Sequence, residues 1–286
     1  MIRIGLAGWG DHGALYPPGT GTQDKLRQYG KTFPIVEVDS SFYAIQPERN
    51  YEKWAQETPA SFGFIVKAYQ GMTGHQRGKP SHESTGAMFE AFIASIRPLR
   101  EAGKLKAVLF QYPPWFDCTR PNVDELRRAK ERMGEMPLAL EFRNQSWFSE
   151  DMRERTLTFM EREGWAHSIC DEPQAGAGSV PIVDVPTHPG LTVVRFHGRN
   201  TEGWHSSGEP NWRDVRYLYH YSREELAEWA GRLVRLQERT EEICVLFNNN
   251  SGGDAAGNAL ELAGMLDLGY PELPETPLQL DLFDDL

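Results

Sequence analysis

The stretch Leu191–Asn200 reads LTVVRFHGRN and begins with the pattern of a buried β-strand. Valine and phenylalanine fit a pleated surface well, and successive side chains of a strand point to opposite faces. Val194 and Phe196 therefore share one face, and Arg195 and His197 share the other. A histidine between two arginines indicates either a core histidine with structural ion pairs or a functional site. The ends of the other strands decide between the two.

Short apolar segments alternate with longer amphipathic segments along the whole chain. This alternation predicts parallel strands joined by helical crossovers, and about eight such units predict one (β/α)8 barrel of the TIM type. The section from Glu172 to Pro189 has no helical period, so we expect one crossover to be mainly loop. The strands are expected at Ile2–Gly8, Ile35–Asp39, Phe62–Ala68, Ala107–Gln111, Leu138–Phe142, Ala166–Cys170, Leu191–Phe196 and Ile243–Phe247. The helices are expected at Asp24–Lys31, Tyr51–Glu57, Thr85–Ala102, Val123–Met133, Asp151–Glu163, Ser222–Arg239 and Ala255–Leu268.

Two local patterns add detail to this outline. Ser222 with Glu225 three residues later predicts a capping box at the start of a helix. The segment Thr201–Tyr221 is rich in tryptophan and tyrosine, so we expect it to pack over another part of the molecule. We expect residues 1–270 to form the barrel domain and residues 271–286 to form a separate acidic tail.

The composition limits the classes of function. The chain has 286 residues and a formal net charge of -11, which argues against nucleic-acid affinity over the whole surface. Three cysteines without CxxC or metal spacing indicate a reducing compartment. The first residues lack the pattern of a signal peptide, and no apolar run reaches the length of a membrane span. We therefore expect a cytoplasmic protein without a membrane partner.

Polar residues recur at the C-terminal ends of the predicted strands, always on the inward face. In barrels of this type the active site lies at that end, built from several strands. The sequence therefore predicts a functional site at the barrel mouth. We expect the inward polar side chains to converge there. They are Glu37 and Asp39, Lys67, Gln111, Glu141 and Arg143, Arg195 and His197, and Asn248.

The same residues lie in motifs that resemble the family called domain of unknown function 72, the YecE-like proteins. These motifs are GWG, VEVDSSFY, FIVK, MTGH, LFQYPP, EFRNQSW, RFHGRN and LFNN, in order from Ile4 to about Leu268. The resemblance implies a TIM barrel and supplies no reaction. It places motif positions on Trp9, Glu37, Phe42, Tyr43, Trp54, Lys67, His75, Gln111, Glu141, Arg143, Trp147, Arg195, His197, Arg199, Asn248 and Asn249.

The chemistry of these side chains suggests an enzyme that acts on a phosphate-bearing substrate, either nucleic acid or a small metabolite. Arginine binds phosphate bidentately, and burial could tune His197 or Glu141 toward neutrality for acid/base catalysis. The catalytic candidates are Glu37, Lys67, His75, Glu141 and His197. The candidates for substrate binding are Trp9, Tyr43, Gln111, Arg143, Trp147, Arg195, Arg199, Asn248 and Asn249.

Several alternatives stay open. The barrel could be a non-catalytic anion- or nucleotide-binding protein, or a small-metabolite isomerase or hydrolase unrelated to DNA. No cofactor is firmly predicted. Glu37, Glu141, His75 and His197 could hold a divalent metal, although the nearby cations would repel it.

The tail suggests a partner. From Pro271 it holds five acidic residues and no lysine or arginine, yet it ends in several apolar residues. Gln279, Leu280, Asp281, Leu282 and Phe283 resemble the pentapeptide by which bacterial DNA polymerases and repair proteins dock on the replication sliding clamp. The alternative is that these residues pack back onto the barrel.

Overall fold

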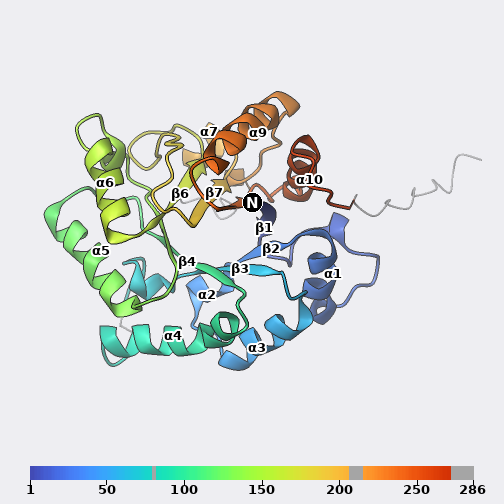
Figure 1. The fold of residues 1–286 in the computed structure, drawn as a ribbon, viewed down its shortest axis with the longest axis horizontal. Coiled ribbons are helices and arrows are strands. Elements are labelled where there is room, and N and C mark those ends of the chain that lie inside the picture. Colours follow the sequence, from blue (N-terminus) through green and yellow to red (C-terminus); the bar gives the residue numbers. More distant parts are fainter. Residues whose placement is uncertain (79–81, 206–214, 272–286) are drawn as a thin grey trace, which may run out of the picture.

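A closed barrel of eight parallel strands forms the centre of the computed structural model, which describes residues 1–78, 82–205 and 215–271 (Figure 1). The strands pair in chain order, and β8 closes the ring against β1 with Val245 opposite Ile4. The predicted (β/α)8 architecture is confirmed. The strands are β1 (Ile2–Ala7), β2 (Ile35–Val38), β3 (Gly63–Lys67), β4 (Leu105–Gln111), β5 (Leu138–Glu141), β6 (Ala166–Asp171), β7 (Leu191–Phe196) and β8 (Glu242–Phe247).

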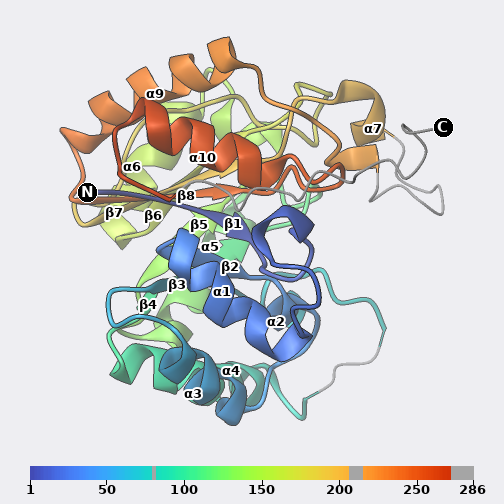
Figure 2. The same ribbon diagram turned by 90° about the vertical axis from the view of Figure 1, so that its right-hand side faces the viewer.

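Helices surround the barrel on its outer side (Figures 1 and 2). In Figure 2 the strands run from left to right, and α7 lies beyond their right-hand ends, at the mouth. Between β6 and β7 the chain forms no helix over residues 172–190, as predicted. The helices are α1 (Lys25–Thr32), α2 (Ser40–Tyr43), α3 (Glu48–Glu57), α4 (Thr85–Glu101), α5 (Arg120–Met133), α6 (Arg153–Glu163), α7 (Thr201–His205), α9 (Arg223–Gln237) and α10 (Ala255–Met265).

Two predicted local features are present at the start of α9 and along the strands. The Ser222 hydroxyl accepts a hydrogen bond from the Glu225 amide, and the Glu225 carboxylate accepts one from the Ser222 amide, which is the capping box. The strands alternate as expected: Val36 packs outward against the helices, whereas Ile35 and Ile65 belong to a separate layer inside the barrel. This alternation carries the polar residues at the strand ends to the inside of the mouth.

The described part of the chain contains no helix that is both long and apolar enough to cross a bilayer. The described chain ends just after Tyr270, whose hydroxyl accepts a hydrogen bond from the Ile4 amide at 2.9 Å. The tail motif Gln279–Phe283 and the aromatic residue Trp212 lie outside the described residues.

Candidate functional site at the barrel mouth

Arg195 occupies the centre of the mouth. It is 1% exposed, and its guanidinium donates to both carboxylate oxygens of Glu37, at 2.6 and 2.8 Å. It also donates to both oxygens of Glu141, at 2.8 and 3.0 Å, and to the side-chain oxygen of Gln111 at 3.3 Å. One arginine from β7 therefore joins side chains from β2, β4 and β5.

A second arginine extends this set of contacts. The Nε of Arg143 donates to Glu141 at 2.6 Å, and its Nη1 donates to Glu172. The other oxygen of Glu172 accepts a hydrogen bond from the Val180 amide at 2.7 Å, which pins the loop that follows β6. The mouth network, by which we mean Glu37, Arg195, Glu141, Arg143 and Glu172, thus alternates carboxylate and guanidinium. It has three carboxylates and two guanidiniums, so full ionisation leaves one negative charge in excess.

Burial and the neighbouring guanidiniums set the pKa values of the network. Burial raises the pKa of Glu37 and of Glu172 to about 7 in each case, against the opposing effects of Arg195 and Arg143. Burial would also raise the pKa of Glu141, but Arg195 and Arg143 together hold it well below its usual range. Within the mouth network, a carboxylate between two guanidiniums stays ionised. A carboxylate at either end of the network, with one guanidinium beside it, can take up a proton near pH 7.

His197 is buried and neutral. Its Nε2 lies 2.8 Å from the Arg143 guanidinium, which can only donate, so this nitrogen accepts and the proton lies on Nδ1. The side-chain nitrogen of Asn248 lies 3.1 Å from Nδ1, so this tautomer requires the Asn248 amide to be turned over, with its oxygen accepting from Nδ1–H. Burial, Arg143 and Arg195 hold the pKa of His197 well below its usual value. The expectation that burial brings the pKa values of His197 and Glu141 close to 7 is wrong for both. Arg143 and Arg195 face each of these groups and lower both pKa values, and burial lowers that of His197 as well.

Asp39 connects the network to solvent. The pKa of Glu37 is raised first by burial and also by the charge of Asp39 and by a side-chain hydrogen bond with it. The Asp39 side chain is 36% exposed, and its carboxylate lies 3.4 Å from the ammonium of Lys67. A proton held on Glu37 therefore has a route to the surface of the mouth through Asp39.

A row of four rings borders this side of the mouth. Tyr43 meets Phe42 edge-on at 5.3 Å between centroids, Phe42 meets His75 at 5.1 Å, and His75 meets Trp115 at 5.8 Å. We call these four residues the ring row. Its two ends are open to solvent, since Tyr43 is 55% and Trp115 is 57% exposed.

Two cations lie over the ring row. The Lys67 ammonium is 4.9 Å from the centre of the Phe42 ring, and the Arg77 guanidinium is 5.6 Å from the Trp115 ring. Burial lowers the pKa of His75 to about 4, helped by the charges of Lys67 and Arg143. His75 is therefore neutral at physiological pH, so the positive charge along the row comes from Lys67 and Arg77.

The three arginines expected to hold an anion are engaged by carboxylates. Arg143 and Arg195 belong to the mouth network. Arg199 forms a bidentate pair with Asp171, with the shortest contact at 2.6 Å, and contacts Glu225 at 3.0 Å. Each of these three arginines already binds carboxylates, which favours the alternative of structural ion pairs around His197 over the predicted phosphate site in this part of the mouth.

Two further candidates for substrate binding are structural. Trp147 is 1% exposed, stacks on Phe142 at 4.1 Å, and donates its indole N–H to the Phe116 carbonyl at 2.7 Å. Asn249 is fully buried and donates to the Tyr219 carbonyl at 2.8 Å. Substrate has no access to either residue, so both predictions are corrected.

The remaining aromatic candidates lie nearer the mouth. Trp9, in the turn after β1, is half-buried and packs edge-on against Trp54 at 5.0 Å. Trp204 of α7 is 5.6 Å from the Arg143 guanidinium and covers it, and Tyr217 lies 6.2 Å from the His197 ring. The expected packing of the aromatic segment over another part of the molecule is thus confirmed for these two residues.

The side chains present do not fit a divalent metal ion. Within the described ranges, one group brings three donor atoms within 4.8 Å of one another, and it consists of Glu141, Cys170 and His197. Arg143 and Arg195 both donate to the Glu141 carboxylate, and Arg143 also donates to Nε2 of His197. A divalent ion in this group would therefore lie against two guanidiniums. Burial also raises the pKa of the Cys170 thiol well above its usual value, which disfavours the thiolate that a metal needs. The other predicted metal ligands, Glu37 and His75, are not part of this group.

Sequence reasoning missed three residues at the mouth. Glu172 and Ser168 both have the inward parity of Cys170 on β6, and the Ser168 hydroxyl donates to Glu141 at 3.1 Å. Applying the same parity test to β6 would have found both. Trp115 comes directly after the motif that contains Gln111, but nothing in the pattern indicates that it is exposed.

Comparisons with known proteins agree with the barrel fold. The family model described as "Protein of unknown function DUF72" matches residues 3–280. The UPF0759 protein YunF of Bacillus subtilis (strain 168) is 57% identical over 284 residues, covering 99% of this chain and 100% of the relative. A crystal structure of a DUF72 family protein from Enterococcus faecalis V583 matches with a TM-score of 0.89 and 36% identity, over 97% of this chain and 100% of that one. One from Thermotoga maritima MSB8 matches with a TM-score of 0.79 and 31% identity, over 93% and 99%.

Proposed function

The chain belongs to the DUF72 family of proteins of unknown function, and we propose from the geometry of its barrel mouth that it is an enzyme. The proposed substrate bears a phosphate and a planar ring, as a nucleotide or the end of a nucleic-acid strand does. The proposed chemistry is proton transfer, in a hydrolysis or an isomerisation.

The ring row is the observation that carries the proposal. Exposed aromatic side chains bind bases by stacking, and cations beside them bind the phosphate backbone. Tyr43 and Trp115 supply the exposed rings, Arg77 supplies a guanidinium beside Trp115, and Lys67 supplies an ammonium that it shares with Asp39. This arrangement replaces the three arginines as the support for a phosphate-bearing substrate.

The mouth network supports the acid/base role. A catalytic acid or base works best when its pKa is near the working pH, which burial gives to Glu37. Asp39 is the group positioned to exchange that proton with a bound substrate, because it is exposed and lies beside Lys67. Glu141 and His197 then act as positioning residues that hold the two arginines in place.

Equilibrium binding of a fluorescent mononucleotide tests the binding part of the proposal. Since stacking on one aromatic residue contributes about 1–3 kcal/mol, Trp115→Ala should weaken binding by about fivefold or more. Val234→Ala is the matched control, because Val234 is 53% exposed but lies on α9. Absence of binding by the natural chain, or equal binding by Trp115→Ala, would remove the nucleotide from the proposal.

Turnover distinguishes an enzyme from a non-catalytic binding barrel. We expect Glu37→Gln to keep nucleotide binding within about threefold and to lose turnover, because the variant has no proton to transfer. If the natural chain binds nucleotides but converts no nucleotide or phosphodiester at any pH, the binding barrel is the better account.

We propose the replication sliding clamp as a protein partner, on the separate evidence of the tail sequence. Gln279 with Leu282 and Phe283 is the type of short motif that fits an apolar pocket on a partner. A tether of this kind would raise the local concentration of the barrel at DNA without a basic surface. A peptide spanning Pro274–Leu286 should bind purified clamp, and one with Leu282→Ala and Phe283→Ala should not. Equal binding by both peptides, or no binding on the order of 100 μM, would remove this partner.

A further inference from the structure

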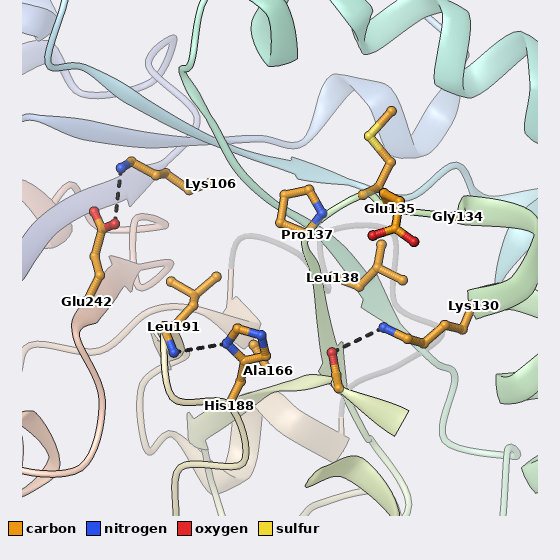
Figure 3. Close-up of a pocket in the computed structure, with 13 residues that line it drawn as sticks. Lys106, Lys130, Gly134, Glu135, Pro137, Leu138, Ala166, His188, Leu191 and Glu242 are labelled. Atoms are coloured by element: carbon orange, nitrogen blue, oxygen red, sulfur yellow. Dashed lines mark hydrogen bonds and ion pairs between the residues drawn. The ribbon is translucent and has the colours of Figure 1, made fainter. Parts of the chain in front are cut away.

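A cavity lies at the end of the barrel opposite the mouth, where the strands begin (Figure 3). Its volume is about 590 Å³, within the range of small-molecule sites. We call it the basal pocket. Its walls include the first residues of β5, β6, β7 and β8, which are Leu138, Ala166, Leu191 and Glu242.

Glu242 lines the pocket from the start of β8, and its carboxylate already forms ion pairs. Glu242 contacts Arg3 at 2.5 Å and Lys106 at 3.0 Å, so two cations share it. These three side chains come from β8, β1 and β4 and together carry one positive charge in excess. The wall also holds the Glu135 carboxylate and the Lys130 ammonium, which together leave this excess of one positive charge unchanged.

Lys130 has no carboxylate at ion-pair distance among the residues that the structure describes. Its ammonium contacts the Gly164 carbonyl at 3.2 Å and lies 5.7 Å from the Trp165 ring (Figure 3). The ammonium has three donors, and a carbonyl satisfies one of them without neutralising the charge. Lys130 therefore brings a positive charge to the wall of the pocket without a direct ion pair, and the charges of Glu163 and of Glu135, which lines the same wall, act on it through space.

His188 adds a second donor. Its Nδ1 accepts a hydrogen bond from the Gly190 amide at 3.1 Å, so the neutral ring carries its proton on Nε2. Burial lowers the pKa of His188, and the charge of Lys130 lowers it further, against the opposing effect of Glu241. Burial likewise lowers the pKa of Lys130. A negative group between them would stabilise the charged form of each.

We propose that the basal pocket binds a small organic anion, a carboxylate or phosphate with a short apolar body, with Lys130 and His188 as its donors. The anionic group lies against the ammonium and the imidazole, and the apolar part lies on the aliphatic wall. That wall is formed by Met136, Pro137, Leu138, Ala166 and Leu191.

Proton NMR of the His188 imidazole tests the proposal in the full chain, with butyrate and inorganic phosphate as separate probes. At saturation the pKa of His188 should rise, and the shift should give a dissociation constant. A charge-assisted hydrogen bond contributes about 1.5–3 kcal/mol, so Lys130→Met should weaken binding by about tenfold or more. Lys31→Met removes the same charge from an exposed position of α1 and should leave binding unchanged.

The two probes identify the anionic group. A response to butyrate alone assigns a carboxylate with an apolar body, a response to phosphate alone assigns a phosphate, and a response to both assigns the shared class. If neither probe shifts His188, or if Lys130→Met binds as tightly as the natural chain, the proposal is overturned. Should Lys130→Met not fold, His188→Gln replaces it, with binding followed by calorimetry and the same expected loss.

Discussion

Glu172→Gln should change how stability depends on pH, and the size of the effect follows from the mouth network. Burial raises the pKa of Glu172 to about 7 in the folded chain, against an ordinary value of 4.5. This difference corresponds to about 3 kcal/mol. The folded chain keeps the proton between about pH 4.5 and about pH 7, whereas the unfolded chain releases it, so the free energy of unfolding falls as pH rises through this window.

Glutamine cannot ionise, so the variant lacks this contribution at every pH. The free energy of unfolding of the natural chain, minus that of Glu172→Gln, should therefore decrease by about 3 kcal/mol from about pH 4.5 to about pH 7.5. Urea unfolding followed by tryptophan fluorescence at a series of pH values measures it. Glu141→Gln is the control of opposite sign, because arginine contacts hold the pKa of Glu141 low and its contribution is present above the unfolded pKa. A difference for Glu172→Gln that stays constant or increases with pH would refute the reasoning.

Three further substitutions test separate parts of the structure by the same unfolding assay. Arg195→Met leaves the buried Glu37 carboxylate without its arginine and Glu141 with Arg143 alone, and should cost about 3–5 kcal/mol, whereas the exposed Arg27→Met should cost less than about 1 kcal/mol; similar losses would contradict the network. Trp147→Ala should cost about 3–5 kcal/mol without changing nucleotide affinity, and a selective loss of affinity would return Trp147 to the binding site. Gly198→Ala should cost at least about 1 kcal/mol, because φ is 81° and a Cβ would lie 2.6 Å from that of Tyr219; an unchanged stability would show that the turn can relax.

The fold and the convergence of the polar residues could be predicted because both follow from local periodicity. The alternation of strand and helix patterns determines the barrel, and a period of two places Glu37 inside and Val36 outside. Arg195 is predicted to face the mouth for the same reason. The sequence does not show that it binds Glu37, which is 158 positions away, rather than a phosphate, because pairing depends on three-dimensional distance.

The aromatic residues show the same limit. Trp147 and Trp115 both follow strands closely; Trp147 ends the motif EFRNQSW, and Trp115 comes directly after the motif LFQYPP. Trp147 is buried because Phe142 and Phe116 lie on its faces, whereas Trp115 is 57% exposed. Local sequence does not encode these neighbours, so the prediction chose Trp147 and missed Trp115.

The most direct test of the account is the protonation state of Glu37. Carbon-13 NMR of glutamate-labelled protein, assigned with Glu37→Gln, gives the pKa of this carboxyl group in the folded chain. We expect the pKa of Glu37 to be about 7 and to fall in Asp39→Asn, because the charge and the hydrogen bond of Asp39 help to raise it. If Glu37 stays ionised down to about pH 5, this residue holds no proton at neutral pH and the proposed acid/base function is contradicted.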